Sequence, residues 1–113
     1  MPVPSFTPDV FHAIASPVRR ALLDQLSSRD RTVRSLAAPF DMTLPAVSQQ
    51  LRVLRGAGLV TVRRVGRWRV YHLNAAPLRD VSVWLHGYER LWTAQLKALG
   101  EDLTKYAKEE RWR

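Results

Sequence analysis

Hydrophobic residues in the first half of the chain recur every three or four positions, the spacing of one buried helix face. The pattern predicts four short helices, the first starting at Thr7-Pro8-Asp9 and the others spanning Pro17–Leu26, Val33–Phe40 and Leu44–Ala57. A hydroxyl residue precedes each helix and can act as its N-cap. Gly58 is expected to end the fourth helix in the left-handed conformation.

After Gly58 the pattern changes to that of strands. Leu59–Val65 is rich in β-branched residues, Arg69–Leu73 is a second strand, and Gly66-Arg67-Trp68 is the turn between them. From Leu78 to Tyr106 apolar residues again recur at steps of three and four, which predicts a helix of roughly 40 Å. Gly87 is expected to bend or break this helix, at a local cost of about 1 kcal/mol.

The predicted fold is mainly α with a small β-hairpin, in the order four helices, two strands and a long final helix. Two short helices joined by a tight turn and followed by a hairpin form a winged helix-turn-helix. Residues 1–8 are interpreted as a flexible N-terminal arm, residues 9–75 as the winged helix-turn-helix domain, and residues 76–113 as a C-terminal dimerisation helix.

Positive charge is concentrated in one third of the chain. The net charge is +8, and the stretch from Met42 to Arg79 contains no Asp or Glu while it carries seven of the 18 basic residues. A solvated surface normally mixes both signs. A segment without acid therefore indicates a polyanionic partner, with nucleic acid favoured over a membrane because no basic amphipathic helix coincides with it.

In such a motif the second helix enters the major groove with its N-terminal half toward the bases. Glutamine can bond adenine, hydroxyls suit base or phosphate, and methyl groups suit thymine. Arginines further along the helix and on the hairpin are expected at phosphates or in the minor groove. The predicted DNA-binding residues are Thr43, Pro45, Ala46, Ser48, Gln49, Arg52, Arg55, Arg63, Arg64, Arg67 and Arg69.

Simpler interpretations of these residues stay open. Ser48, Gln49 and Gln50 could form an ordinary exposed helix face, although such a face normally carries pairs of Glu and Lys. The hairpin arginines could protect a strand edge from aggregation. Trp68 could contact the DNA backbone or pack onto the domain.

A resemblance to the ArsR/SmtB family of winged-helix repressors is carried by the runs SPVRRALLDQL and TVRSLAAPFDMTLPAVSQQLRVLRGAGLVTVRRVGRWRVYHLN. It covers about Phe11 to Asn74, and PAVSQQLRVLRGAGLV is its most specific part. The resemblance implies a homodimer that binds double-stranded DNA at an inverted repeat and represses transcription. Ser48 and Gln49 match the family's base-reading positions, whereas Gln50 stands where many members carry histidine.

The metal ligands used by many members of that family have no counterpart in this sequence. The chain has no cysteine, and the Asp and His residues of its last helix do not match the family's spacing. Zinc needs three or four converging ligands, and the three histidines are isolated along the chain. We therefore expect a metal-independent member without a cofactor, and the sequence identifies no small-molecule effector.

The last helix carries more apolar surface than one small domain covers. Bulky residues beside the main apolar row give it two apolar faces between Val81 and Leu99, and such a helix usually has two partners. One face is assigned to the same protomer and the other to a second copy, with the first helix contributing. The predicted dimer interface is Phe11, Val81, Leu85, Tyr88, Leu91, Trp92, Leu96, Leu99 and Leu103.

Other classes of function have less support. A cysteine nucleophile, a glycine-rich phosphate loop and a carboxylate or histidine cluster are all missing from the sequence, so an enzyme is not predicted. The alternatives to a sequence-specific repressor are a nonspecific DNA binder and a winged-helix module for protein contacts. With no signal peptide and no apolar run of membrane length, the expected location is the cytoplasm.

Overall fold

The computed structural model describes residues 9–111, and the side chains of residues 9–100. The chain divides into two compact units, Met1–Val81 and Ser82–Arg113. The N-terminal arm predicted for residues 1–8 and the side chain of Leu103 lie outside the described residues.

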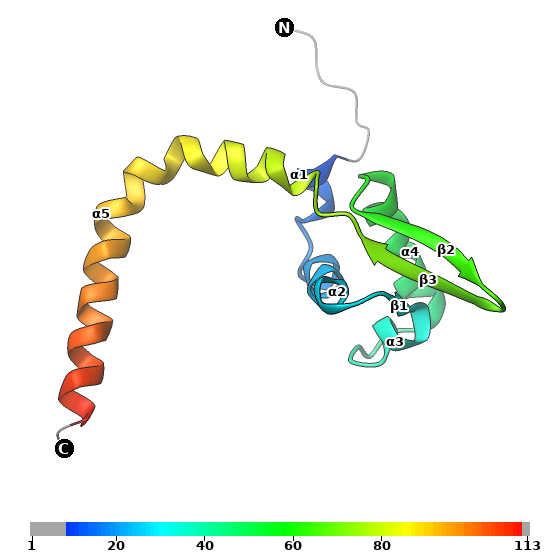
Figure 1. Ribbon diagram of the computed structural model, residues 1–113, viewed down its shortest axis with the longest axis horizontal. Coiled ribbons are helices and arrows are strands. Elements are labelled where there is room, and N and C mark those ends of the chain that lie inside the picture. The colour runs from blue at the N-terminus through cyan, green and yellow to red at the C-terminus, as the bar shows by residue number, and fades with distance from the viewer. Residues whose placement is uncertain (1–8, 112–113) are drawn as a thin grey trace, which may run out of the picture. The chain divides into compact units, whose positions relative to one another are not determined.

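The first unit is a winged helix-turn-helix, as predicted (Figure 1). The hairpin of its last two strands projects beyond the helices as the wing. The elements are, in chain order, α1 (Val10–Ala13), α2 (Pro17–Ser28), β1 (Arg31–Thr32), α3 (Val33–Ala37), α4 (Leu44–Gly56), β2 (Val60–Val65), β3 (Trp68–Leu73) and α5 (Leu78–Arg111).

Side-chain caps set the starts of the helices. The hydroxyls of Ser16, Thr32 and Thr43 accept hydrogen bonds from the backbone N–H three residues later, at 3.2–3.3 Å. This confirms the predicted starts of α2, α3 and α4. The predicted start of α1 is wrong, because Asp9 is the N-cap and its carboxylate accepts from His12 N at 2.9 Å.

Helix α3 is shorter than predicted, since it ends at Ala37 and not at Phe40. Ala38 keeps helical backbone angles, but Pro39 has no N–H to continue the helical hydrogen bonds. The chain then turns, with a bond from Phe40 N to Ala37 O of 2.9 Å. Helix α4 stops as expected, because Gly58 has a φ of +77°.

The sheet has three antiparallel strands in the order β1-β3-β2, and not the two that the sequence predicts. β1 lies between the second and third predicted helices, where no strand was expected, and in it Arg31 pairs with Tyr71 and Thr32 with Val70. In the hairpin Val65 pairs with Trp68, so the turn contains two residues and not three. Gly66 at its first position has a φ of +60°, as a type II′ turn requires.

One hydrophobic core joins the helices of the first unit to the sheet. Its largest fully buried side chains come from α2, α3, α4 and the chain at the start of β2, and they are Leu22, Leu36, Val47, Leu51, Leu54, Leu59 and Val60. Leu78 and Val81, in the first turns of α5, pack against this core. The predicted buried row of α4 is confirmed, and it leaves the opposite face of that helix at the surface.

Helix α5 is continuous from Leu78 to Arg111. Of the bend or break expected at Gly87, a break is excluded, and the ribbon of α5 bends where its colour passes from yellow to orange (Figure 1). Among the described residues, no helix combines the length and apolarity needed to cross a membrane.

Candidate nucleic-acid interface

The exposed face of α4 carries the residues predicted to read bases. Pro45, Gln49, Arg52 and Arg55 are exposed, while Ala46 and Ser48 are half-buried. Thr43 is exposed, but its hydroxyl oxygen already accepts the capping bond from Ala46 N at 3.2 Å. The side chains on this face that reach furthest into solvent are therefore one glutamine and two arginines.

Gln49 is positioned by its neighbour one turn later. Arg52 Nη1 donates to Gln49 Oε1 at 3.0 Å. An amide oxygen has two lone pairs, and the amide nitrogen of Gln49 keeps both donors. The bond therefore orients Gln49 and still leaves it able to accept from and donate to an adenine edge.

Gln50 faces the other way, toward the first two helices. Its Oε1 accepts from Arg19 Nη1 at 3.0 Å, and the same guanidinium donates to the backbone oxygens of His12 and Ala13 at 3.1 and 2.7 Å. Arg19 is half-buried. Gln50 thus joins α4 to the end of α1, away from the surface that holds Gln49.

The strand register separates the wing arginines onto two faces. Arg64 pairs with Arg69, and the next pair toward the tip is Val65 with Trp68. Successive residues of a strand point to opposite faces of the sheet, so Arg64 and Arg69 lie on the inner face, which also holds the buried Val60. Arg67 is exposed in the turn.

On this inner face the wing meets the end of α4. An open cleft of about 230 Å³ is lined by Arg55 from α4 and by Val62, Arg63, Arg64 and Arg69 from the hairpin. Its lining contains no acid, and within the described part of the chain Arg55, Arg64 and Arg69 have no carboxylate partner. We call Arg55, Arg64 and Arg69 the arginine cleft.

The side chain of Arg63 belongs to the outer face and is already paired. Its Nη1 lies 2.6 Å from Asp30 Oδ2, and His72 Nδ1 lies 2.7 Å from Asp30 Oδ1. Hydrogen bonds from His72 and then Arg63 lower the pKa of the Asp30 carboxyl below its usual value. Sequence reasoning missed Asp30, because its partners lie 33 and 42 residues away and no local pattern marks it.

The second unit presents bulky apolar side chains to solvent. The predicted interface residues between Leu85 and Leu99 are all exposed in the single chain, Leu91 to 67%. Of the other predicted interface residues, Phe11 is exposed and Val81 is half-buried against the core. Of the α5 face that was predicted to pack on its own protomer, only Leu78 and Val81 contact the core.

Comparison with known proteins identifies the family. Residues 16–62 match the family described as bacterial regulatory protein, arsR family. The transcriptional repressor SdpR of Bacillus subtilis is 35% identical over 77 residues, which are 68% of this chain and 86% of SdpR. The chain belongs to the ArsR family. Its winged helix-turn-helix is that of a transcriptional regulator and not of an enzyme.

Solved structures of ArsR proteins share the fold. The crystal structure of an ArsR family transcriptional regulator has a TM-score of 0.66 and 37% identity, with 74% of this chain and 86% of that chain covered. The homodimeric winged helix-turn-helix DNA-binding domain of Mb0332 from Mycobacterium bovis has a TM-score of 0.59 and 30% identity, with 74% and 80% covered.

Possible metal ligands of this ArsR protein lie apart or in pairs. Across the described residues no group of three or more His, Cys, Asp and Glu side chains could hold an ion. His72 contacts Asp30, and His86 Nδ1 lies 2.7 Å from Glu89 Oε2 within α5. Arg63 occupies the other side of Asp30. Metal independence stays a prediction.

Proposed function

We propose that this protein is a sequence-specific transcriptional repressor that binds an inverted-repeat operator as a homodimer in the cytoplasm. The relatives that carry this inference are a transcriptional repressor and a homodimeric DNA-binding domain. Within each protomer, Gln49 would read bases with the contacts of Thr43, Pro45, Ala46 and Ser48 around it, and arginines would hold the phosphates.

The observation that supports this best is the arginine cleft beside the exposed face of α4. Three arginines, from α4, β2 and β3, line the same cleft without a carboxylate among them. Like charges held together repel one another, and an anion in the cleft would relieve that repulsion. A DNA backbone passing from α4 to the wing would bring phosphates to it, and Arg52 and Arg67 extend the same basic surface at either end.

The exposed apolar residues of α5 support the second copy. A row of Leu, Trp and Tyr side chains exposed over several turns exceeds the scattered apolar residues of a monomer surface. Pairing of two α5 helices would cover this row. In a dimer on B-DNA, recognition helices about 34 Å apart would contact successive major grooves on one side of the duplex.

The test is a fluorescence anisotropy titration of labelled duplex at fixed salt. The upstream region of the protein's own gene is compared with a scrambled duplex of equal length and composition. We expect tighter binding to the upstream region by a factor of about 10³ or more, as specific sites normally show. Equal affinity for the two duplexes would favour the nonspecific binder and overturn the repressor proposal.

A protein-interaction module is the other alternative. It would bind neither duplex at physiological salt, and neutralising the arginine cleft would then have no effect on DNA binding. The concentration of uncompensated arginines on α4 and the wing speaks against it.

A further inference from the structure

The outer face of the wing carries a hollow that DNA binding by the inner face does not use. It has a volume of about 390 Å³ and is lined by Thr32, Arg34, Val65, Trp68 and Val70. Val65 pairs with Trp68, and Val70 pairs with Thr32, so these four side chains share one face of the sheet. Arg64 and Arg69 point to the opposite face.

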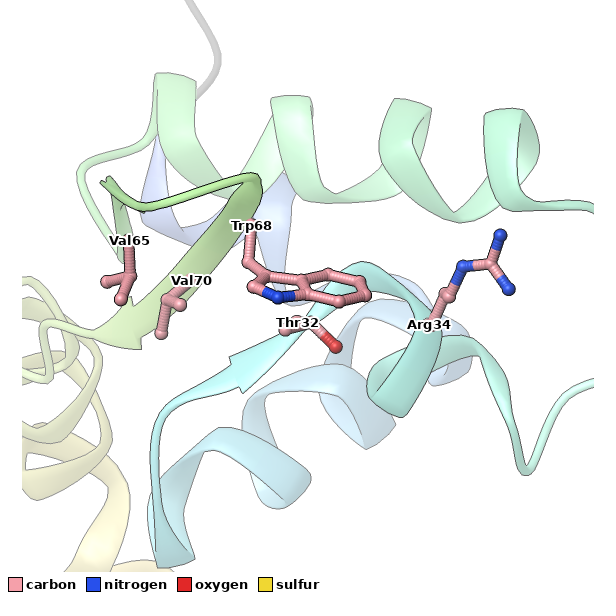
Figure 2. Close-up of a pocket in the computed structure, with 5 residues that line it drawn as sticks. All are labelled: Thr32, Arg34, Val65, Trp68 and Val70. Carbon is pink, nitrogen blue, oxygen red and sulfur yellow. The ribbon is translucent and has the colours of Figure 1, made fainter.

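The floor of this hollow is apolar and open to solvent. Trp68 is 56% exposed and Val65 is 49% exposed. Figure 2 shows the indole of Trp68 lying across Thr32, with the two valines on one side and Arg34 on the other. The volume falls in the range of small-molecule sites, which combine an apolar or aromatic lining with a few polar groups.

The polar groups at the rim can all donate hydrogen bonds, and no acid is among them. Within the described residues neither the Arg34 guanidinium nor the Trp68 indole N–H has a hydrogen-bond partner. Thr32 Oγ1 accepts the capping bond from Ser35 N at 3.3 Å, which leaves its hydroxyl hydrogen to donate. An apolar floor with three hydrogen-bond donors fits an apolar ligand that ends in a negatively charged hydrogen-bond acceptor.

We propose that this outer hollow binds a small aromatic carboxylate. The ring would stack on the indole of Trp68, and the carboxylate would form a bidentate pair with Arg34. Because the lining comes from β1 and α3 as well as from the wing, the ligand would bridge the helix-turn-helix and the hairpin. That position makes the hollow a candidate effector site outside both α5 and the arginine cleft.

The experiment uses the full chain and 1-naphthaleneacetate as the probe, with neutral 1-naphthaleneacetamide as its matched partner. Binding is followed by the indole N–H signals in a ¹H–¹⁵N NMR spectrum. The chain has four tryptophans, and the signal of Trp68 is assigned by its loss in Trp68→Phe. We expect the acid to shift the Trp68 signal saturably and the amide to bind about tenfold more weakly, since one charge-assisted pair is of that size.

Arg34→Gln should weaken binding of the acid about tenfold and leave binding of the amide unchanged. Arg79→Gln is the control, because it removes the same charge from an exposed arginine that lines neither the hollow nor the arginine cleft. Both variants change exposed side chains, so loss of folding does not confuse the result.

Three results would overturn the proposal. The first is no saturable shift of the Trp68 signal at millimolar probe, or a shift of the α5 tryptophans alone. The second is equal binding of acid and amide, or no effect of Arg34→Gln. The third is that operator DNA moves the same signal and displaces the probe, which would assign the hollow to the DNA contact.

Discussion

Asp30 and Arg63 form a 2.6 Å ion pair that joins the start of β1 to the wing, 33 residues apart in the chain. His72 contacts the second oxygen of the same carboxylate. Arg63 therefore has an acid partner, whereas the other arginines of the wing have none among the described residues. It also holds the hairpin against the segment that leads into α3.

The Asp30 contacts predict a loss of stability in acid. The pKa of Asp30 is lowered in the folded state, so the stabilisation is complete above the unfolded value of 3.8 and is lost as the pH falls through the lowered pKa. The melting temperature of the wild type should therefore decrease more between pH 5 and pH 3 than that of Asp30→Asn. Asp24→Asn, at an exposed aspartate of α2, is the control. Parallel pH curves for wild type and Asp30→Asn would contradict this.

The two faces of the wing predict unequal roles for its arginines. Arg64→Ala and Arg69→Ala should each weaken binding to all duplexes and reduce the slope of log K against log salt by about 1. Arg67→Ala should act in the same way. Arg63→Ala should change the slope less, because Arg63 is paired with Asp30. Anisotropy titrations at several salt concentrations measure the slope, and an equal effect of Arg63→Ala and Arg64→Ala would refute the division into faces.

Gln49 is expected to read bases and not phosphates. Gln49→Ala should reduce the preference for the operator over a mutated operator by about 1–3 kcal/mol, with the salt slope unchanged. Gln50→Ala is the matched control, since its Oε1 is bonded to Arg19. A similar loss of preference in both variants would show that the two glutamines act alike.

The apolar row of α5 predicts how the dimer can be separated. Leu91 is 67% exposed in the single chain, so Leu91→Glu should not disturb the core but should place a charge in the interface. Analytical ultracentrifugation should then give a monomer, and affinity for the two-site operator should fall. Gln95→Glu is the matched control, because it adds the same charge at a neighbouring exposed position that is already polar. Unchanged dimerisation in Leu91→Glu would remove this residue from the interface.

Metal independence is tested by adding zinc or a chelator during operator titrations. We expect the affinity to stay unchanged, because no three of the described His, Asp and Glu side chains lie together in a group that could hold an ion. A large effect of the chelator would indicate a site built from more than one chain.

The helix starts were predictable because a cap is a local signal. Ser16, Thr32 and Thr43 each lie three residues from the N–H that they accept, and Gly58 marks the end of α4 within the same few residues. β1 has only two residues, too few to show a period. Its existence depends on β3, far along the chain, as do the contacts of Asp30.

The same limit applies to the candidate site. The sequence identified the acid-free region and hence most of the basic surface, since composition alone carries that information. It could not separate Arg63 from Arg64, because the separation depends on which residue of β3 pairs with which residue of β2. The position of Trp68, left open by the sequence, follows from that pairing as well.

Side chains alternate between the two faces of the hairpin, and this alternation limits how the length of the hairpin can change. Insertion of one residue into β2 would exchange the faces beyond that point, turning Arg64 outward and a valine inward. Both the arginine cleft and the hollow at Trp68 would be lost in that single step. An insertion of two residues would lengthen the wing and keep each side chain on its own face, so a change by two residues preserves both surfaces.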